Sequence, residues 1–298
     1  MKRASPPTRL ALDWVLSGNP SEFHLTPAQS LRAGVMRNEG PAPLGSDVHA
    51  GLEIGLTLTG CAERHYLDWV VPGAPGDVWL CAMWEPHGWR FVAPRTDWVV
   101  AVFLPEFLGE ERLGDLPWLT LFATPPSQRP RVSTPELRRT VLTIGEELRH
   151  EITRQQPGWQ TPVRLDLLRL LFHLSRGWEP PAPSGLGPPL GAGGLSRITP
   201  ALTLLREHDP PELSLSEAAA ACGLKRSRFS AIFRQTMGLS FGGFRLRARL
   251  ALAARLLRAT ALTTEDVAAR IGFADASHLH RAFVKEYGCT PRQYRQRA

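Results

Sequence analysis

The chain has 298 residues and a formal net charge of +7, a length that indicates two domains of ordinary size. Hydrophobic residues make up 43% and charged residues 21%, close to globular averages, which excludes a disordered chain, a collagen and a coiled coil. No apolar run is long enough for a signal peptide or a membrane-spanning helix. We therefore expect a cytoplasmic protein with no membrane partner.

The four cysteines, Cys61, Cys81, Cys222 and Cys289, are far apart in the sequence. Their spacing lacks the close pairs that a zinc knuckle or a redox pair requires. We expect buried thiols in a reducing compartment.

Charge divides the chain unevenly. Residues 196–298 contain 17 basic and 8 acidic residues, net +9, whereas the preceding part contains 18 basic and 20 acidic residues, net −2. Such asymmetry indicates a polyanionic partner for the last third, most often nucleic acid, although a solvated basic face produces the same balance.

The first 130 residues are rich in Trp, Val, Gly and Pro, and contain short apolar runs such as 52–58 and 77–83 between Gly or Pro clusters. Short strands at intervals of about ten residues favour a β-sandwich or barrel over a parallel βαβ sheet.

From Thr134 the pattern becomes helical, with Val141, Ile144 and Leu148 at steps of three or four residues. A second apolar stripe continues to Leu174, so 134–178 is predicted to be an antiparallel helix pair. This pair either covers its own β domain or packs on its copy in a second subunit. We place the first domain at 1–178.

Residues 179–195 read EPPAPSGLGPPLGAGGL, in which ten of seventeen positions are Pro or Gly. This composition cannot sustain a helix or a central strand, so it predicts a linker. The second domain is then 196–298.

The second domain contains an approximate internal repeat. An acidic residue is followed six residues later by a glycine in both copies, Glu217 with Gly223 and Asp266 with Gly272. The later matches are offset by 50 residues: Phe229 with Leu279, Phe233 with Phe283, Gly238 with Gly288, Phe244 with Tyr294, and Arg245 with Arg295. Two like modules are indicated, too few for a solenoid.

Each module is predicted to be a helix, a glycine turn and a second helix. Ser214 or Ser216 caps the first helix of the first module, and Thr263 or Thr264 does so in the second. The second helices, 225–237 and 275–287, expose short and basic side chains that suit a major groove about 12 Å wide. A predicted helix over 241–259, with five arginines, spans roughly 28 Å, close to the roughly 34 Å between successive major-groove faces.

The motif GFADASHLHRAFVKEYGCTPRQYR at 272–295 resembles the signature of the arabinose-regulator (AraC/XylS-type) transcription factors. The resemblance covers about 197–297, and it implies that the second helix of each module reads bases. By position it nominates Arg226, Ser227, Ser230, Ala231, Ala276, Ser277, His280 and Arg281. His280 beside Leu279 departs from the usual Phe followed by a small polar residue, and no alkyl-transfer cysteine motif of the DNA-repair relatives is present.

The first domain is similar to the cupin barrels that such regulators carry. The segment DVHAGLEIGLTLTG at 47–60 matches the first cupin motif except that Asp47 replaces its first histidine, and 75–87 resembles the second motif, ending at His87. The resemblance implies a small effector, a sugar being one candidate, with His49, Glu53, Trp84 and His87 as candidate contacts.

The same segment offers a metal site as an alternative. Asp47, His49, Glu53 and His87 supply carboxylates and imidazoles suited to a divalent metal, and 47, 49 and 53 share the parity of one strand face. Regulators of this family generally bind effectors without metal, so we expect no cofactor.

Together these features predict a β-rich, cupin-like barrel with a helical pair, followed by an all-α double helix-turn-helix domain. The function expected is a sequence-specific DNA-binding transcription regulator, not an enzyme, with double-stranded DNA and a small-molecule effector as partners. A homodimer is expected, and RNA polymerase is a further candidate partner. The alternatives are a metal-dependent cupin enzyme, an isomerase or oxygenase with secondary DNA binding, and a DNA-architectural protein without an effector.

Overall fold

A computed structural model describes residues 11–12, 25–66, 69–110, 112–181, 193–207 and 212–297. The chain separates into two units. A β-rich unit contains Gly51–Met83 and His87–Pro181 together with the chain up to Asp47. A helical unit contains Ala182–Ala298 and two short segments, Val48–Ala50 and Trp84–Pro86.

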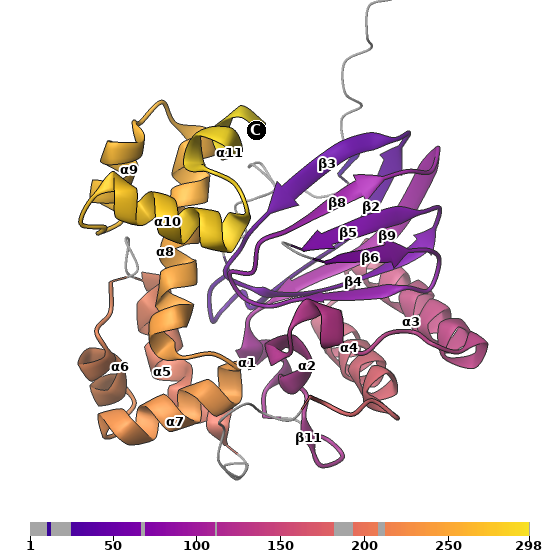
Figure 1. The fold of residues 1–298 in the computed structure, drawn as a ribbon. Helices are drawn as coiled ribbons and strands as arrows, with labels where there is room; N and C mark the ends of the chain where they lie inside the picture. Colours follow the sequence, from indigo (N-terminus) through magenta and orange to yellow (C-terminus); the bar gives the residue numbers. More distant parts are fainter. Residues whose placement is uncertain are drawn as a thin grey trace, which may run out of the picture. The chain divides into compact units, whose positions relative to one another are not determined.

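The β-rich unit is built from two antiparallel sheets (Figure 1). The larger sheet has the order β1 (Ala11–Leu12), β2 (Leu31–Glu39), β9 (Arg95–Phe103), β4 (Leu52–Thr59), β7 (Val78–Cys81). The smaller has the order β3 (Ala42–Asp47), β8 (His87–Phe91), β5 (Ala62–Tyr66), β6 (Val70–Gly73). A separate hairpin joins β10 (Arg112–Leu113) to β11 (Leu116–Pro117).

The predicted strand-rich first domain is therefore confirmed, but a closed barrel is not. No strand of one sheet pairs with a strand of the other among the described residues, so the sheets remain two layers. A barrel requires continuous ladders around its circumference, which this pairing does not provide.

The two faces of β4 follow the period-2 alternation of a strand. Leu56 and Leu58 pack against α3 (Pro135–Arg154), where a Cβ on Gly145 would lie 2.5 Å from Leu56 and 2.9 Å from Leu58. The opposite face carries Glu53 and Thr57, which are also buried. Strand β4 is thus covered on both sides, and its inner face is polar.

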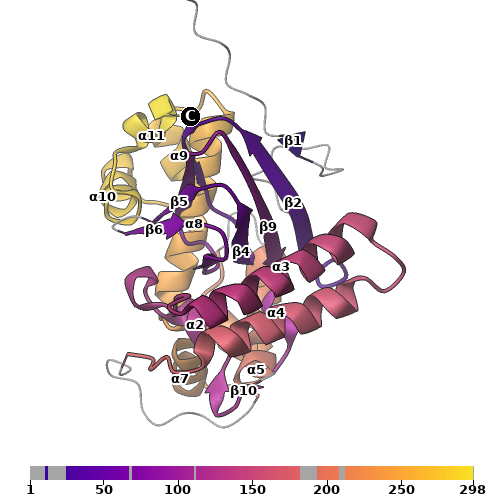
Figure 2. The ribbon, with the colours of Figure 1, turned by 90° about the vertical axis from the view of Figure 1, so that its right-hand side faces the viewer.

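Helix α3 lies along the larger sheet beside its antiparallel partner α4 (Gln160–Ser175), as Figure 2 shows. Thr134 caps α3 by accepting a hydrogen bond from the Leu137 amide at 3.1 Å, and Pro135 occupies the first helical position. The predicted helix pair is therefore present. The remaining short helices of this unit are α1 (Pro105–Leu108), α2 (Thr120–Ala123) and the 3-10 turn η1 (Pro126–Gln128).

The helical unit contains seven helices in its described part: α5 (Gly194–Glu207), α6 (Leu215–Ala221), α7 (Arg226–Met237), α8 (Phe241–Ala259), α9 (Thr264–Arg270), α10 (Ala276–Tyr287) and α11 (Pro291–Arg297). Helix α5 begins at Gly194, within the predicted linker, because Ile198, Leu202 and Leu205 give it a buried apolar stripe. Residues 182–192 of that linker lie outside the described residues.

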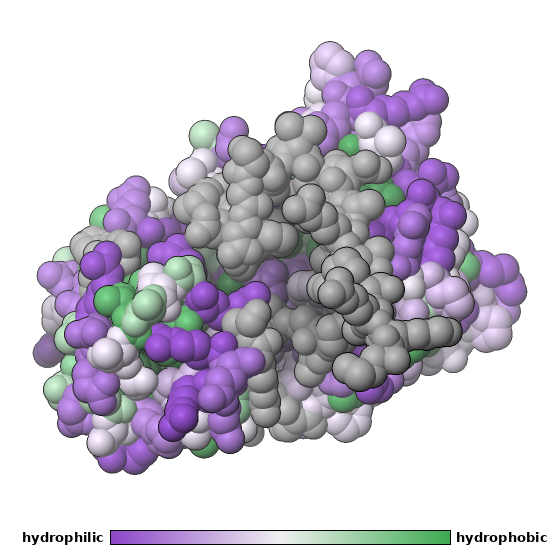
Figure 3. All heavy atoms as spheres, turned by 90° about the horizontal axis from the view of Figure 1, so that it is seen from above, coloured by the Kyte–Doolittle hydropathy of each residue, from purple (hydrophilic) through white to green (hydrophobic). Residues whose placement is uncertain are grey.

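The surface is predominantly polar where the described atoms can be seen. In the view of Figure 3, hydrophilic residues in purple cover most of the coloured surface, and hydrophobic residues in green form small patches. Within the described ranges, no helix is both long and apolar enough to cross a membrane.

Candidate nucleic-acid interface and buried polar cluster

Two helix-turn-helix motifs, α6–α7 and α9–α10, begin with the same capping arrangement. Ser214 Oγ accepts from the Glu217 amide at 3.1 Å, and the Glu217 carboxylate accepts from the Ser214 amide at 2.8 Å. Thr263 and Asp266 form the same reciprocal pair, at 3.1 and 3.2 Å. These capping boxes satisfy amides that would otherwise lack partners, and they select Ser214 and Thr263 from the predicted alternatives.

The turns between the paired helices depend on glycine. Gly223 has φ +62° and Gly272 has φ +73°, both in the left-handed region that side chains with a Cβ disfavour. The internal repeat of the sequence therefore corresponds to a repeat of backbone geometry.

Helix α7 buries Phe229, Ile232 and Phe233; the rings of Phe229 and Phe233 contact each other in a tilted arrangement, and Phe233 meets Phe241 edge to face. Its opposite face exposes Arg226, Ser227, Arg228, Ala231 and Arg234, with Ser230 partly exposed. Arg228 was not among the predicted contacts, although its charge, which a core position would not accept, could have indicated it. The face combines cations with small side chains, as a helix entering the major groove requires.

Helix α10 buries Leu279 and Phe283 and is capped by Asp275, whose carboxylate accepts from the His278 amide at 2.6 Å. Its exposed face carries Ser277, His278, His280, Arg281 and Lys285, with Ala276 partly exposed. His278 and Lys285 were not predicted. All eight nominated reading residues therefore lie on the outer faces of α7 and α10, and none contributes to the core.

Three arginines of α8 have structural partners. Arg245 Nη1 donates to the Leu213 carbonyl at 2.8 Å, Arg247 pairs with Glu286 of α10 at 2.8 Å, and Arg249 Nε donates to the Ile271 carbonyl at 2.7 Å. The amphipathic pattern of this helix does not distinguish an arginine with a carbonyl partner from one in solvent, so the five arginines were not told apart from the sequence.

One of these contacts recurs in the second motif. Arg295 of α11, fifty residues after Arg245, donates to the carbonyls of Leu257 and Leu262. Leu213 and Leu262 each immediately precede the capping residue of the first helix of their motif. In each motif, an arginine from the helix that follows the motif is thus hydrogen-bonded to the residue just ahead of the cap of the motif's first helix, and we say that this contact closes the motif.

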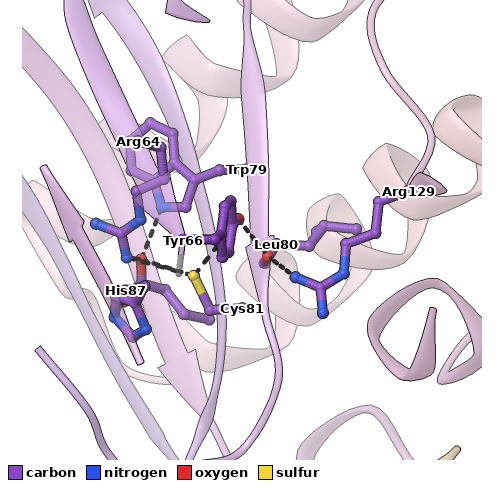
Figure 4. A network of polar contacts seen from close by, with 8 residues as sticks. Arg64, Tyr66, Trp79, Leu80, Cys81, His87 and Arg129 are labelled. Carbon is purple, nitrogen blue, oxygen red and sulfur yellow. Dashed lines mark hydrogen bonds and ion pairs between the residues drawn. The ribbon is translucent and has the colours of Figure 1, made fainter. Parts of the chain in front are cut away.

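A buried polar cluster lies inside the β-rich unit (Figure 4). Glu53 of β4 accepts hydrogen bonds at Oε1 from Trp79 Nε1 at 2.7 Å and from Arg64 Nη2. Arg64 Nη2 also donates to Cys81 Sγ at 3.4 Å, and the His87 imidazole lies 3.5 Å from Glu53 Oε2. These side chains come from four different strands, β4, β5, β7 and β8.

The electrostatics of this cluster favour the charged forms of Arg64 and His87. Burial lowers the pKa of Arg64, but Cys81 and Glu53 outweigh that effect and raise it overall. Burial likewise lowers the pKa of His87, whereas Cys81 and Glu53 raise it, to about 10. The Arg64 guanidinium also lies over the rings of Trp79 and Trp89, at 5.3 and 5.8 Å from their centroids.

A second arginine extends this network. Tyr66 OH donates to the Leu80 carbonyl at 2.6 Å, and Arg129 Nη1 donates to the same carbonyl at 2.5 Å (Figure 4). Arg129 also donates to the carbonyls of Thr124 and Phe122 at 2.8 and 3.0 Å. Arg129 is therefore a buried connector between β7 and the segment that follows α2.

The structure brings together three of the residues predicted from the cupin resemblance: candidate ligand atoms of Asp47, His49 and His87 lie within 4.8 Å of one another. Glu53 and His87 belong to the polar cluster, and Asp47 pairs in register with His87 across β3 and β8. His49 and Trp84 lie instead on the two short segments that group with the helical unit. Asp47 and His49 do not lie on one strand, because β3 ends at Asp47, but the predicted proximity of their side chains is present. Arg64, Trp79 and Cys81 were not predicted as site residues.

Comparison with known proteins identifies the helical unit. Residues 218–297 match the helix-turn-helix domain family. The RCS-specific HTH-type transcriptional activator RclR of Escherichia coli K12 is 32% identical over 84 residues, 28% of this chain and 30% of that protein. The HTH-type transcriptional activator RhaR of Yersinia pseudotuberculosis is 42% identical over 66 residues, 22% of this chain and 23% of that protein.

The matching segment thus spans less than a third of the length of these curated relatives. Among solved structures, ToxT from Vibrio cholerae O395 aligns with a TM-score of 0.46 at 9% identity, covering 90% of this chain and 97% of that one. The C-terminal part of this chain, with its paired motifs, carries a helix-turn-helix domain of the AraC type.

Proposed function

We propose that the chain is a sequence-specific DNA-binding transcription regulator whose β-rich unit responds to a small-molecule effector. The observation that carries the proposal is the pair of helix-turn-helix motifs, each of which exposes a basic second helix with small side chains. In this proposal α7 and α10 read base edges in the major groove, and the surrounding arginines supply the salt-dependent contacts with phosphates.

A salt-titrated gel shift on the DNA upstream of the gene tests this function. Arg226→Ala and Arg281→Ala should each weaken specific binding by about 1–3 kcal/mol, because each removes one side chain from a reading face. Arg139→Ala is the matched control, since Arg139 is exposed on α3 and pairs only locally with Glu136 at 3.1 Å. A DNA affinity that did not depend on the DNA sequence and was unchanged by either substitution would refute the proposal.

Dimerisation is proposed to use the exposed side of the α3–α4 pair. Leu165 and Phe172 of α4 are 57% and 42% exposed, an unusual position for large apolar side chains seven residues apart on one helix. Light scattering should report a dimer for the wild type and a shift toward monomer for Leu165→Glu. A regulator of this kind works in the cytoplasm, where RNA polymerase remains a candidate partner.

A metal-dependent activity is a second candidate, favoured by two groups of possible ligands, Asp47 with His49 and His87, and Glu53 with Cys81 and His87. Ligand atoms of Glu53, Cys81 and His87 lie within 4.8 Å of one another, and all three residues are buried. Carboxylate, thiolate and imidazole are donors that zinc accepts. However, the Arg64 guanidinium already donates to both Glu53 and Cys81, and its positive charge disfavours a cation at the same place.

We therefore propose that Arg64, not a metal, balances the charge of Glu53. Elemental analysis of the purified protein distinguishes the two arrangements. We expect less than about 0.1 metal ion per chain, whereas near-stoichiometric metal that is lost in His87→Ala would favour the metal-dependent candidate.

A further inference from the structure

Helix α8 connects the two helix-turn-helix motifs, and one of its contacts is not repeated. At the offset of 49 residues that relates Ser214 to Thr263 and Gly223 to Gly272, the position corresponding to Arg249 is Pro200 of α5, which has no donor side chain. Arg249 instead reaches out of its own helix. It donates through Nε to the Ile271 carbonyl at 2.7 Å and through Nη2 to the Gly272 carbonyl.

Arg249 also packs against the turn with its flat surface. Its guanidinium lies over the ring of Phe273, 4.4 Å from the centroid. Ile271, Gly272 and Phe273 connect α9 to α10, and Asp275, the cap of α10, follows two residues later. A displacement of this turn would therefore carry the start of the second reading helix with it.

The other side of the same junction belongs to the first motif. A Cβ on Gly272 would fall 1.7 Å from Glu212 Oε1, so the Glu212 carboxylate lies directly against the turn. Glu212 stands just before Ser214, the cap of α6. Burial lowers the pKa of Arg249, and the charge of Glu212 partly opposes this effect.

We propose that Arg249 is a positioning residue that sets the spacing between α7 and α10, and so the separation of the two DNA subsites that one chain recognises. The inference rests on the proposed function. Two donors to successive carbonyls and a planar face on an aromatic ring are properties of a guanidinium that an ammonium lacks. Arg249→Lys therefore separates this role from a phosphate contact, because the variant keeps the charge and loses the geometry.

The test is selection of bound duplexes from a randomised DNA pool by the full chain, using wild type, Arg249→Lys and the control Arg255→Lys. Arg255 is exposed on the same helix. Wild type and control should enrich two short sequence blocks at one spacing. Arg249→Lys should enrich the same blocks over several spacings.

A quantitative version uses the selected duplex with one base pair inserted between its blocks. The insertion should weaken wild-type binding about tenfold and Arg249→Lys binding no more than about twofold, a difference typical of coupling between packed elements. An insertion penalty in Arg249→Lys equal to that of wild type would overturn the inference. If the wild type enriched no sequence, sequence-specific DNA binding itself would be refuted, and the proposed role of Arg249 would fall with it.

Phe273→Leu provides an independent variant in case Arg249→Lys does not fold, as judged by thermal unfolding. It removes the aromatic surface under the guanidinium and leaves both carbonyl acceptors in place. We expect the same broadening of spacing to a smaller degree, and a single unchanged spacing in a folded Phe273→Leu would also contradict the proposed role.

Discussion

Arg64 of the β-rich unit and the repeated arginines of the helical unit have contrasting partners. In the β-rich unit Arg64 is 7% exposed and its partner is a buried carboxylate, Glu53. In the helical unit Arg245 and Arg295 donate to backbone carbonyls, while Arg226 and Arg281 are exposed on the reading helices. Residue type alone therefore does not indicate a role in DNA binding; the partner of each guanidinium does.

The largest expected effect is at the buried pair. Glu53→Gln keeps the shape of the side chain but removes the carboxylate that pairs with the buried Arg64 guanidinium. We expect a loss of about 3 kcal/mol in the free energy of unfolding, since removing one member of a buried pair strands the other charge. Urea denaturation measures it.

Glu63→Gln is the matched control for that change. Glu63 pairs with Arg90 at 2.7 Å on the surface of the same unit, where Arg90 is half exposed. We expect Glu63→Gln to lose little free energy of unfolding, because water replaces the Glu63 carboxylate as the partner of the exposed Arg90 guanidinium. Equal losses at Glu53 and Glu63 would contradict the contrast between buried and exposed charges.

The backbone contacts of the helical unit should have intermediate effects. Arg245→Ala and Arg295→Ala each remove donors from partly buried carbonyls ahead of a capping residue, so each should cost about 1–3 kcal/mol in unfolding free energy. Arg292→Ala, exposed on α11, should cost almost nothing. If thermal unfolding showed that Arg292→Ala destabilises the chain as much as Arg245→Ala and Arg295→Ala do, the proposed stabilising role of the two repeated arginines would be wrong.

The smallest expected effect concerns pH and the α3–α4 pair. Burial, together with Glu147 and Glu151, raises the pKa of Asp166 to about 6, although Arg169 opposes the shift. The folded chain thus binds this proton more tightly than the unfolded chain, so the group favours folding at low pH and this contribution is lost as the pH rises through about 6.

Asp166→Asn should accordingly be more stable than wild type at pH 7.5, by about 1 kcal/mol once solvent screening is allowed for, with a smaller difference at pH 5. Melting temperatures at both pH values measure it. A difference that grew toward acid pH would show that the carboxylate stabilises the folded chain.

Much of the helical unit could be predicted because its signals are local. Helix α8 spans 241–259 as predicted, since its apolar spacing and the preceding Ser240 cap are adjacent in sequence. The nominated reading residues were found outside the core for the same reason: burial of Phe229, Phe233, Leu279 and Phe283 determines which helix face remains exposed.

The polar cluster could be predicted only in part. Glu53 and His87 were identified through a motif, but Arg64, Trp79 and Cys81 join them through strand register, which a single sequence does not specify. Asp47 and His49 were predicted to lie on one continuous strand; the chain leaves β3 after Asp47, yet the candidate ligand atoms of the two residues still lie within 4.8 Å of each other and of His87.

The repeated arginine has a consequence for the history of this domain. Arg245 and Arg295 each return to the residue ahead of the first cap of their own motif, so each module carries the contact that closes it. A duplicated gene segment with this property would encode its own stabilising arginine-to-carbonyl hydrogen bond. Later substitutions of its outward-facing residues would therefore leave the fold of the module unchanged. The divergence between Arg226 and Ala276, at equivalent positions of the two reading helices, is what such independent drift would produce.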